Sequence, residues 1–145
     1  MYAKSKRKID KIIIHCTATP EGREVDVDEI RKWHKARGWR DVGYHYVIKL
    51  NGIVQLGRHV DEIGSHTKGH NSNSIGVVYA GGLDADTREA KNTRTIMQDI
   101  AFVYLLRHLK DQYPDATLHG HNEFSNKACP SFDVQKEYGW IYEQE

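Results

Sequence analysis

Cys129 and its neighbours are the residues of this sequence whose types are best suited to chemistry. The chain of 145 residues holds only two cysteines, and Cys129 lies in a polar segment beside a lysine rather than in an apolar run. Such surroundings are typical of a cysteine that reacts or binds a metal. His121 lies eight positions before Cys129. Because zinc accepts imidazole nitrogen and thiolate sulfur together, this pair could supply two ligands of a metal site.

His15 is the candidate third ligand. Three protein ligands with a fourth position left for water form the pattern of catalytic zinc, and a metal-activated water implies hydrolysis. Spacing alone does not decide this, because the chain has nine histidines and contains neither an HExxH nor a CxxC motif. These residues leave open the alternative that Cys129 is a nucleophile with His121 as its base.

Three further side chains could take part in such a reaction. Tyr44 stands at the start of an expected strand and could place its hydroxyl beside the activated water, although tyrosines on half-buried strands usually pack. Lys127 would bring a positive charge next to Cys129 and could stabilise an oxyanion, or it could be a solvated loop lysine. His66 lies in an expected surface loop that could border a cleft.

A first strand must position His15. Residues 9–15 predict a strand buried on both faces, because three isoleucines follow one another. Side chains alternate along a strand, so His15 and Cys16 point to opposite faces. Cys16 shares its face with Ile12 and Ile14, and we therefore expect Cys16 in the hydrophobic core.

The remaining segments alternate between helix and strand patterns. Residues 93–113 have the longest helical pattern, and its apolar stripe is so wide that we expect the sheet to cover most of this helix. The other expected elements are a helix at 26–37, a hairpin of strands at 44–50 and 53–56, strands at 75–80 and 116–120, and a short helix at 132–138. This order predicts an α/β fold, a single domain with a mixed central β-sheet flanked by helices. Ligand sites of such sheets lie beyond strand ends, where His15 and His121 are expected.

Composition limits the classes of partner. A net charge of +1 with 28% charged residues gives no general affinity for nucleic acid, so we expect no nucleic-acid partner. Residues 1–8 form a basic arm that we expect to be flexible. No apolar run approaches the roughly 20 residues of a membrane span, so we expect no membrane insertion. No signal peptide is recognisable, so we expect the chain to be synthesised in the cytoplasm.

Five segments together resemble one known family, the zinc-dependent N-acetylmuramoyl-L-alanine amidases. Within this family the likeness is greatest to the amidase lysozymes of the T-odd phages, and the peptidoglycan recognition proteins are more distant members. The likeness runs in order from about residue 9 to residue 138. The segments that carry it are 14–19 (IHCTAT), 39–46 (WRDVGYHY), 64–66 (GSH), 73–77 (NSIGV) and 127–133 (KACPSFD).

The resemblance assigns roles to individual residues. It implies one catalytic zinc ion, held by His15, His121 and Cys129. It also implies that Tyr44 is the catalytic tyrosine and that Lys127 stabilises the oxyanion. His66 and Asn73 become candidate substrate-binding residues in the groove that the family places beside the metal.

The function that the resemblance implies is hydrolysis of the amide bond between N-acetylmuramic acid and L-alanine in bacterial peptidoglycan. The chain would then be a phage or prophage endolysin, which acts on the cell wall after release through a holin-type pore. A module that binds peptidoglycan without cutting it is the alternative, although such family members typically lack the cysteine ligand. The T-odd phage members also bind an RNA polymerase, and we do not carry that activity over.

Overall fold

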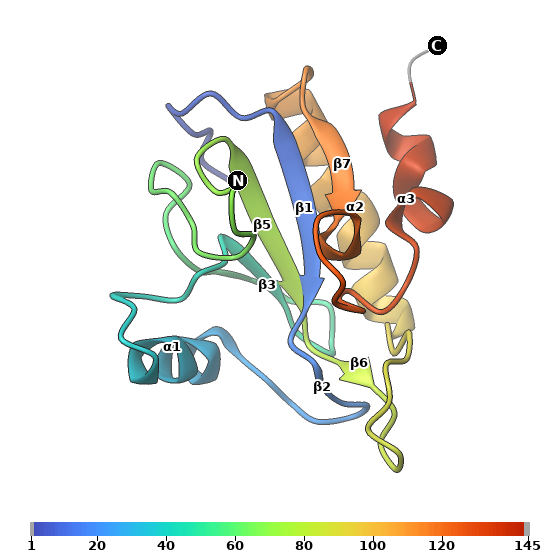
Figure 1. Ribbon diagram of the computed structural model, residues 1–145. Helices are drawn as coiled ribbons and strands as arrows, with labels where there is room; N and C mark the ends of the chain where they lie inside the picture. The colour runs from blue at the N-terminus through green and yellow to red at the C-terminus, as the bar shows by residue number, and fades with distance from the viewer. Residues whose placement is uncertain (1, 144–145) are drawn as a thin grey trace.

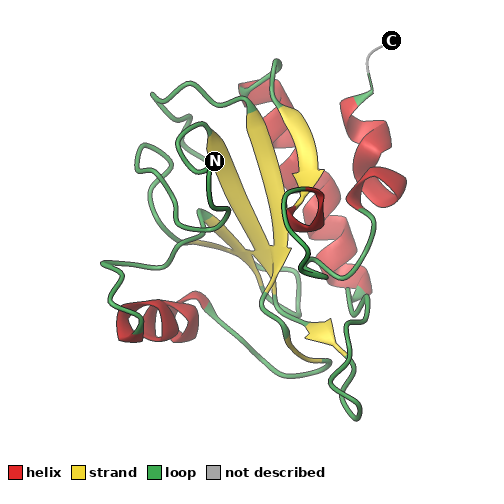
Figure 2. Ribbon diagram, in the orientation of Figure 1, coloured by secondary structure: helices red, strands yellow, loops and turns green. Residues whose placement is uncertain are grey.

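The computed structural model describes residues 2–143, which form an α/β domain with a mixed five-stranded sheet (Figures 1 and 2). The sequence prediction of the fold class is therefore confirmed. In chain order the elements are β1 (Lys11–Cys16), β2 (Thr19–Pro20), α1 (Val27–Ala36), β3 (Tyr46–Ile48), β4 (Val54–Leu56), β5 (Ser74–Tyr79), β6 (Gly82–Leu83), α2 (Ile96–Gln112), β7 (Thr117–Gly120), the 3₁₀ turn η1 (His121–Glu123) and α3 (Val134–Tyr142).

The strand order of the sheet is β4-β3-β5-β1-β7. β1 pairs in parallel with both β5 and β7, and Figure 1 shows that their arrowheads point the same way. β3 is parallel to β5 and antiparallel to β4, so the expected hairpin is the one antiparallel pair of this sheet. Parallel strands end at the same edge, and the residues that follow β1 and β7 therefore meet there.

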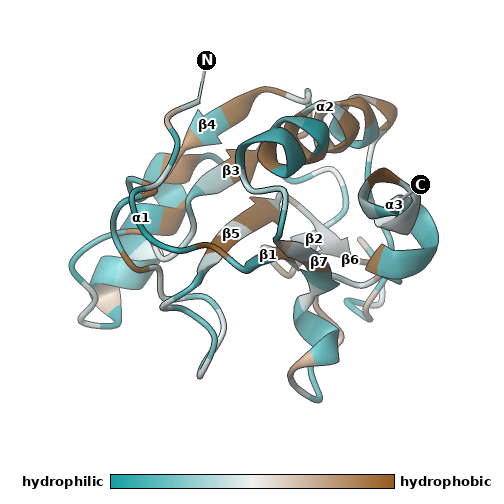
Figure 3. Ribbon diagram, turned by 90° about the horizontal axis from the view of Figure 1, so that it is seen from above, coloured by the Kyte–Doolittle hydropathy of each residue, from teal (hydrophilic) through white to brown (hydrophobic). Residues whose placement is uncertain are grey.

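Helices cover both faces of the sheet. On one face, alternate residues of β1, β3 and β5 pack against α2 and α3, and Cys16 belongs to this core as expected. On the other face, Val47 and Val78 pack against Val27 and Ile30 of α1. Figure 3 shows hydrophobic residues concentrated along β5, between the helical layers. His15 pairs in register with Val78, which places it on the face that α1 partly covers.

The helix boundaries follow from their caps. Asp26 precedes α1 and its carboxylate accepts a hydrogen bond from the backbone N–H of Glu29 at 2.9 Å. Thr95 begins α2 with a capping box, in which its hydroxyl and the side chain of Gln98 each satisfy a backbone N–H. Both caps lie within two residues of the predicted helix starts.

The prediction that α2 is largely covered is wrong. One side of α2 packs in the core, but Ile96 and Tyr104 are 80% and 77% exposed, and Met97 and Ile100 are also exposed. The apolar stripe is wider than the sheet that it meets, because only one face of a helix can contact one sheet.

The amino-terminal segment is held by contacts, in contrast to the flexible arm that its charge suggested. The backbone N–H of Ser5 donates to the Tyr113 hydroxyl at 2.6 Å, and the Ser5 hydroxyl donates to the carbonyl of Val60 at 2.7 Å. The Arg7 guanidinium donates to four backbone carbonyls of residues 60–74. Met1, which the predicted arm included, lies outside the described residues. Among residues 2–143, none of the helices has the length and apolar character needed to span a membrane.

Candidate metal centre

The edge where β1 and β7 end brings together His15, His121 and Cys129. His15 is the fifth residue of β1, His121 begins η1 directly after β7, and Cys129 lies in the loop before α3. One ligand atom from each of these residues lies within 4.8 Å of the other two. Within the described residues, this is the one group of histidine, cysteine or acidic side chains that converges in this way.

The two ring nitrogens of His15 face different groups. Nδ1 lies 3.9 Å from the Cys129 sulfur, and Nε2 lies 2.9 Å from Nδ1 of His66 and 3.2 Å from the Thr67 hydroxyl. Burial holds the pKa of His15 well below its usual range, and the neighbouring His66, His121 and Lys127 lower it further. His15 is therefore neutral at pH 7, and a nitrogen lone pair is free for a metal.

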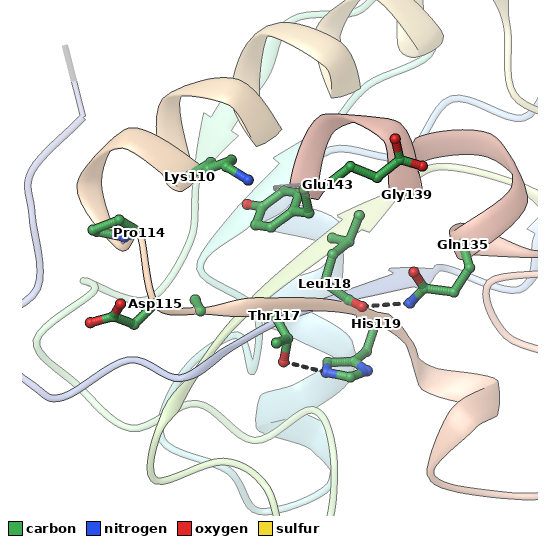
Figure 4. A pocket seen from close by; sticks show the side chains of 11 residues that line it. Lys110, Pro114, Asp115, Thr117, Leu118, His119, Gln135, Gly139 and Glu143 are labelled. Carbon is green, nitrogen blue, oxygen red and sulfur yellow. Dashed lines mark hydrogen bonds between the residues drawn. The ribbon is translucent and has the colours of Figure 1, made fainter. Parts of the chain in front are cut away.

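His121 completes the pair of imidazoles. Its ring centroid lies 4.7 Å from that of His15, and burial together with the charge of Lys127 lowers its pKa. The nearby His119 points elsewhere: its ring contacts Thr117 and Glu123 and lines a separate hollow of about 370 Å³ between β7 and the ends of α2 and α3 (Figure 4). None of the predicted site residues lines that hollow.

Cys129 lies where its sulfur can serve as a ligand, in the same group as His15 and His121. Its sulfur accepts a hydrogen bond from the backbone N–H of Cys16 at 3.2 Å. The side-chain hydrogen bond with Cys16 and burial raise the pKa of the free Cys129 thiol, while the Cys16 N–H and Lys127 oppose that rise. A thiol that stays protonated at neutral pH is a poor nucleophile, whereas a bound cation stabilises its thiolate directly.

This donor set fits zinc. Two neutral imidazoles and one thiolate are ligands that zinc prefers, and tetrahedral zinc separates its ligand atoms by roughly 3.3 to 3.7 Å. The 3.9 Å between His15 Nδ1 and Cys129 Sγ lies within a few tenths of an ångström of that range.

Tyr44 lies beside the His15 ring, with 5.1 Å between the ring centroids. Backbone contacts fix the segment that carries it. The N–H of Gly43 donates to Nδ1 of His34 on α1 at 2.8 Å, and the carbonyl of Tyr44 accepts from the N–H of Arg58 at 2.8 Å. Burial, Cys129 and Cys16 raise the pKa of Tyr44, so its phenol stays protonated at neutral pH. β3 itself begins at Tyr46, two residues later than predicted.

A cleft of about 560 Å³ opens beside these residues. His66, His121 and Lys127 lie on its wall, and Lys127 is exposed. The other side chains that line the cleft are Trp39, Ser65, Thr67, Lys68, Asn71, Phe124 and Ser125. Within the described residues, the lining thus contains two lysines and no carboxylate, and it offers a positively charged wall next to the ligand group.

The structure places Asn73, the other candidate substrate-binding residue, away from the ligand group. Asn73 precedes β5, and its carbonyl accepts hydrogen bonds from the N–H groups of Asp10 and Lys11 at the start of β1. It therefore lies at the opposite edge of the sheet from the ligand group and lines a different hollow. Asn71 lines the cleft instead, and its side-chain oxygen accepts from the N–H groups of His66 and Thr67. No periodicity marks Asn71, because it lies in an irregular loop.

Comparisons with known proteins identify the family of this chain. The family model described as N-acetylmuramoyl-L-alanine amidase matches residues 5–132. The endolysin of Enterobacteria phage K11 is 44% identical over 136 residues, which cover 94% of this chain and 87% of that protein. The endolysin of Escherichia phage T7 is 46% identical over 134 residues, which cover 92% and 87%.

A solved structure shares the fold. The N-acetylmuramoyl-L-alanine amidase LysC from Clostridium intestinale URNW superposes with a TM-score of 0.80 at 23% identity, covering 99% of this chain and 95% of that chain. The family model spans most of the sequence, and the relatives match over nearly their whole length. The chain therefore belongs to the N-acetylmuramoyl-L-alanine amidase family and is itself such an amidase.

Proposed function

We propose that this amidase cuts the bond between N-acetylmuramic acid and L-alanine in peptidoglycan with a single zinc ion held by His15, His121 and Cys129. The observation that carries the proposal is the convergence of three suitable ligand atoms within 4.8 Å at the end of β1. When bound there, zinc lowers the pKa of water toward about 7 and polarises the carbonyl under attack.

Tyr44 orients the water that attacks the amide carbon. Its phenol lies next to His15, on the side of the ligand group that faces α1. Because its pKa is raised, the hydroxyl keeps its proton at neutral pH and can donate as well as accept a hydrogen bond. This group therefore holds the attacking water in line; as the C–N bond breaks, the hydroxyl gives its proton to the leaving amine and regains one from the attacking water.

Lys127 stabilises the negative oxygen that forms on the amide carbon. It lies on the cleft wall with His121, and its charge is close enough to lower the pKa values of both His15 and His121. A cation that influences both imidazoles also stabilises negative charge that develops on a substrate oxygen beside them.

The cleft beside the ligand group is the proposed binding site for the substrate. Its positively charged lining, next to aromatic Trp39 and Phe124, suits a peptide that carries carboxylates and lies along the wall. Because its phage relatives are endolysins, we place this enzyme among the endolysins. We expect it to be made in the cytoplasm and to act on the cell wall after release through a holin-type pore. A module that binds peptidoglycan without cutting it is disfavoured by the presence of Cys129.

Metal analysis with a cleavage assay tests the proposal. The purified chain is expected to contain about one zinc per molecule and to release new amino-terminal L-alanine from peptidoglycan. A chelator should stop the release, and added zinc should restore it. Tight binding to peptidoglycan without release by the zinc-loaded protein would instead support the non-catalytic module. Release that persists without metal would refute the zinc centre.

A further inference from the structure

His66 lies behind His15 rather than over the position where substrate would react. Nδ1 of His66 is 2.9 Å from Nε2 of His15, on the side of the His15 ring away from Cys129. Nε2 of His66 is 3.2 Å from the hydroxyl of Ser74. We propose that His66 is a positioning residue, which fixes the orientation and tautomer of His15 for metal binding and does not bind substrate. This inference rests on the proposed zinc centre.

The His66 ring fills a slot beside two glycines. It stands edge-on to His15 with 85° between the ring planes. Its atoms occupy the space that a side chain would need at two glycines: a Cβ built on Gly76 of β5 would come 2.6 Å from the His66 ring, and one on Gly64 would come 2.7 Å from it. Contacts this short do not occur between real atoms, so the two glycines leave a slot that the imidazole fills.

The loop that carries His66 is tied down on its other side. The N–H groups of His66 and Thr67 both donate to the side-chain oxygen of Asn71, at 3.0 and 2.9 Å. The carbonyl of Asn71 accepts in turn from the Arg7 guanidinium at 3.4 Å. The imidazole is therefore held by its backbone as well as by its slot, as a positioning residue must be.

The direction of each hydrogen bond follows from the ligand role of His15. If Nδ1 of His15 faces the metal, its Nε2 carries the hydrogen and donates. Nδ1 of His66 must then accept, its Nε2 carries the hydrogen, and that hydrogen is donated to the Ser74 hydroxyl. The Thr67 hydroxyl lies within 3.2 Å of His15 Nε2 and 3.0 Å of His66 Nδ1, and it can share the same acceptor role. With His15 bound to the metal through Nδ1, every group in this chain of contacts has the donor or acceptor that it needs.

Such partners of metal ligands have a measurable effect. Removing one typically weakens metal affinity or activity by about 10 to 100-fold, because the ligand loses its orientation and its basicity. A substrate-binding residue behaves differently, since its loss raises KM and leaves the affinity for metal unchanged. Because His66 also lines the cleft, the two roles must be separated by experiment.

The test compares four variants for zinc dissociation constant and for kcat and KM at saturating zinc. His66→Leu removes the acceptor, and His66→Asn keeps an oxygen near the position of Nδ1. Ser74→Ala removes the partner on the far side of the ring. The matched control is His59→Leu, which changes an exposed histidine that lies outside this group of contacts. Thermal unfolding of each variant checks that it is folded.

We expect His66→Leu to bind zinc about 10 to 100-fold more weakly, with KM close to that of the wild type. His66→Asn should recover most of the affinity, Ser74→Ala should lose several-fold, and His59→Leu should match the wild type. Zinc affinity within twofold of the wild type in His66→Leu, with a raised KM, would overturn the inference. If His66→Leu does not fold, unchanged zinc affinity in Ser74→Ala would overturn it. A wild-type protein that binds no zinc would instead refute the proposed function.

Discussion

Cys129 is the residue whose replacement tests the metal centre most directly. Its sulfur lies 3.9 Å from Nδ1 of His15, and a serine hydroxyl is a far weaker ligand for zinc than a thiolate. We expect Cys129→Ser to lose bound zinc and at least 100-fold of its activity, as an order-of-magnitude expectation for a lost ligand. Metal content and release of L-alanine measure the two effects.

Cys16 provides the matched control for that substitution. It is the other cysteine of the chain and lies in the core, with its side chain on the opposite face of β1 from His15. Cys16→Ser should keep its zinc, because Cys16 supplies none of the three ligand atoms, and should lose about 1–3 kcal/mol of stability, because a more polar group is buried in the core. Equal zinc content in Cys129→Ser and the wild type would contradict the ligand assignment.

A substitution at Tyr44 tests the chemical step separately from zinc binding. Its hydroxyl is proposed to act on water and proton, whereas its ring packs against His15. Tyr44→Phe keeps the ring, so we expect unchanged zinc content and a kcat lower by about 10² to 10⁴-fold. Steady-state kinetics on soluble muramyl peptide measure the change. Full activity in this variant would remove Tyr44 from the mechanism.

At the scale of elements, we predict that α1 affects catalysis although it supplies no ligand of the proposed metal centre. His34 of α1 accepts the N–H of Gly43 and thereby fixes the backbone that presents Tyr44. His34→Leu leaves that buried N–H without a partner, at a cost of about 1–3 kcal/mol. We expect it to lower kcat while zinc content stays unchanged.

The control for His34→Leu lies on the same helix. Lys35→Leu changes the neighbouring, exposed residue of α1 and should alter neither kcat nor zinc content. If His34→Leu retains the wild-type kcat, then α1 does not position Tyr44 and the contact between His34 and Gly43 is only structural.

The elements also show what could be predicted from sequence. The sequence predicts the strands β1 and β7. Because they are parallel, their carboxyl ends lie at the same edge of the sheet. His15 and His121 could therefore be placed together before the structure was known. Cys129 could not be placed in this way, because no periodicity fixes the path of the loop between η1 and α3. Resemblance to the family supplied that placement.

Loop residues could not be placed from the sequence. Asn73 stands only two positions from Asn71, yet the two residues line different hollows, because the chain turns at residues 71–73 before β5 begins. The role of His66 depends on a slot formed by Gly64 and Gly76, which are twelve residues apart in sequence. Such close approaches are set by tertiary packing, and propensity or hydrophobic pattern contains no information about them.

At the scale of the whole molecule, the metal should stabilise the fold. Its proposed ligands join β1 to two segments more than one hundred residues later in the chain, so zinc binds the folded state and not the separated segments. Zinc at 100 times its Kd should add about 2.7 kcal/mol, which raises Tm by roughly 5–11 °C for a domain of this size. Calorimetry with zinc and with a chelator measures the difference. In Cys129→Ser the difference should nearly vanish, and a Tm of the wild type that does not respond to zinc would contradict the centre.

Two buried histidines predict how stability depends on pH. Burial lowers the pKa of His34 and of His45 from 6.5 to about 4, and each ring is held neutral by a backbone N–H that donates to its Nδ1. Between pH 6.5 and 4 the unfolded chain therefore binds protons that the folded chain excludes. The free energy of unfolding must fall as pH decreases through this window, and these two groups contribute no further change below about pH 4.

Urea unfolding of the metal-free protein at pH 7, 6 and 5 measures the total slope where carboxylates scarcely titrate, and the lowered pKa values of His15, His66 and His121 add to it in the same direction. We expect the free energy of unfolding to decrease at each step. His45→Asn keeps an oxygen that can accept the N–H of Gly76 but cannot be protonated, so its slope should be shallower than that of the wild type. Equal slopes in the two proteins would show that His45 is not kept neutral by the fold. A free energy of unfolding that rises toward pH 5 would contradict the role of both histidines. Histidines that are buried in the neutral form can only lower this free energy as the pH decreases.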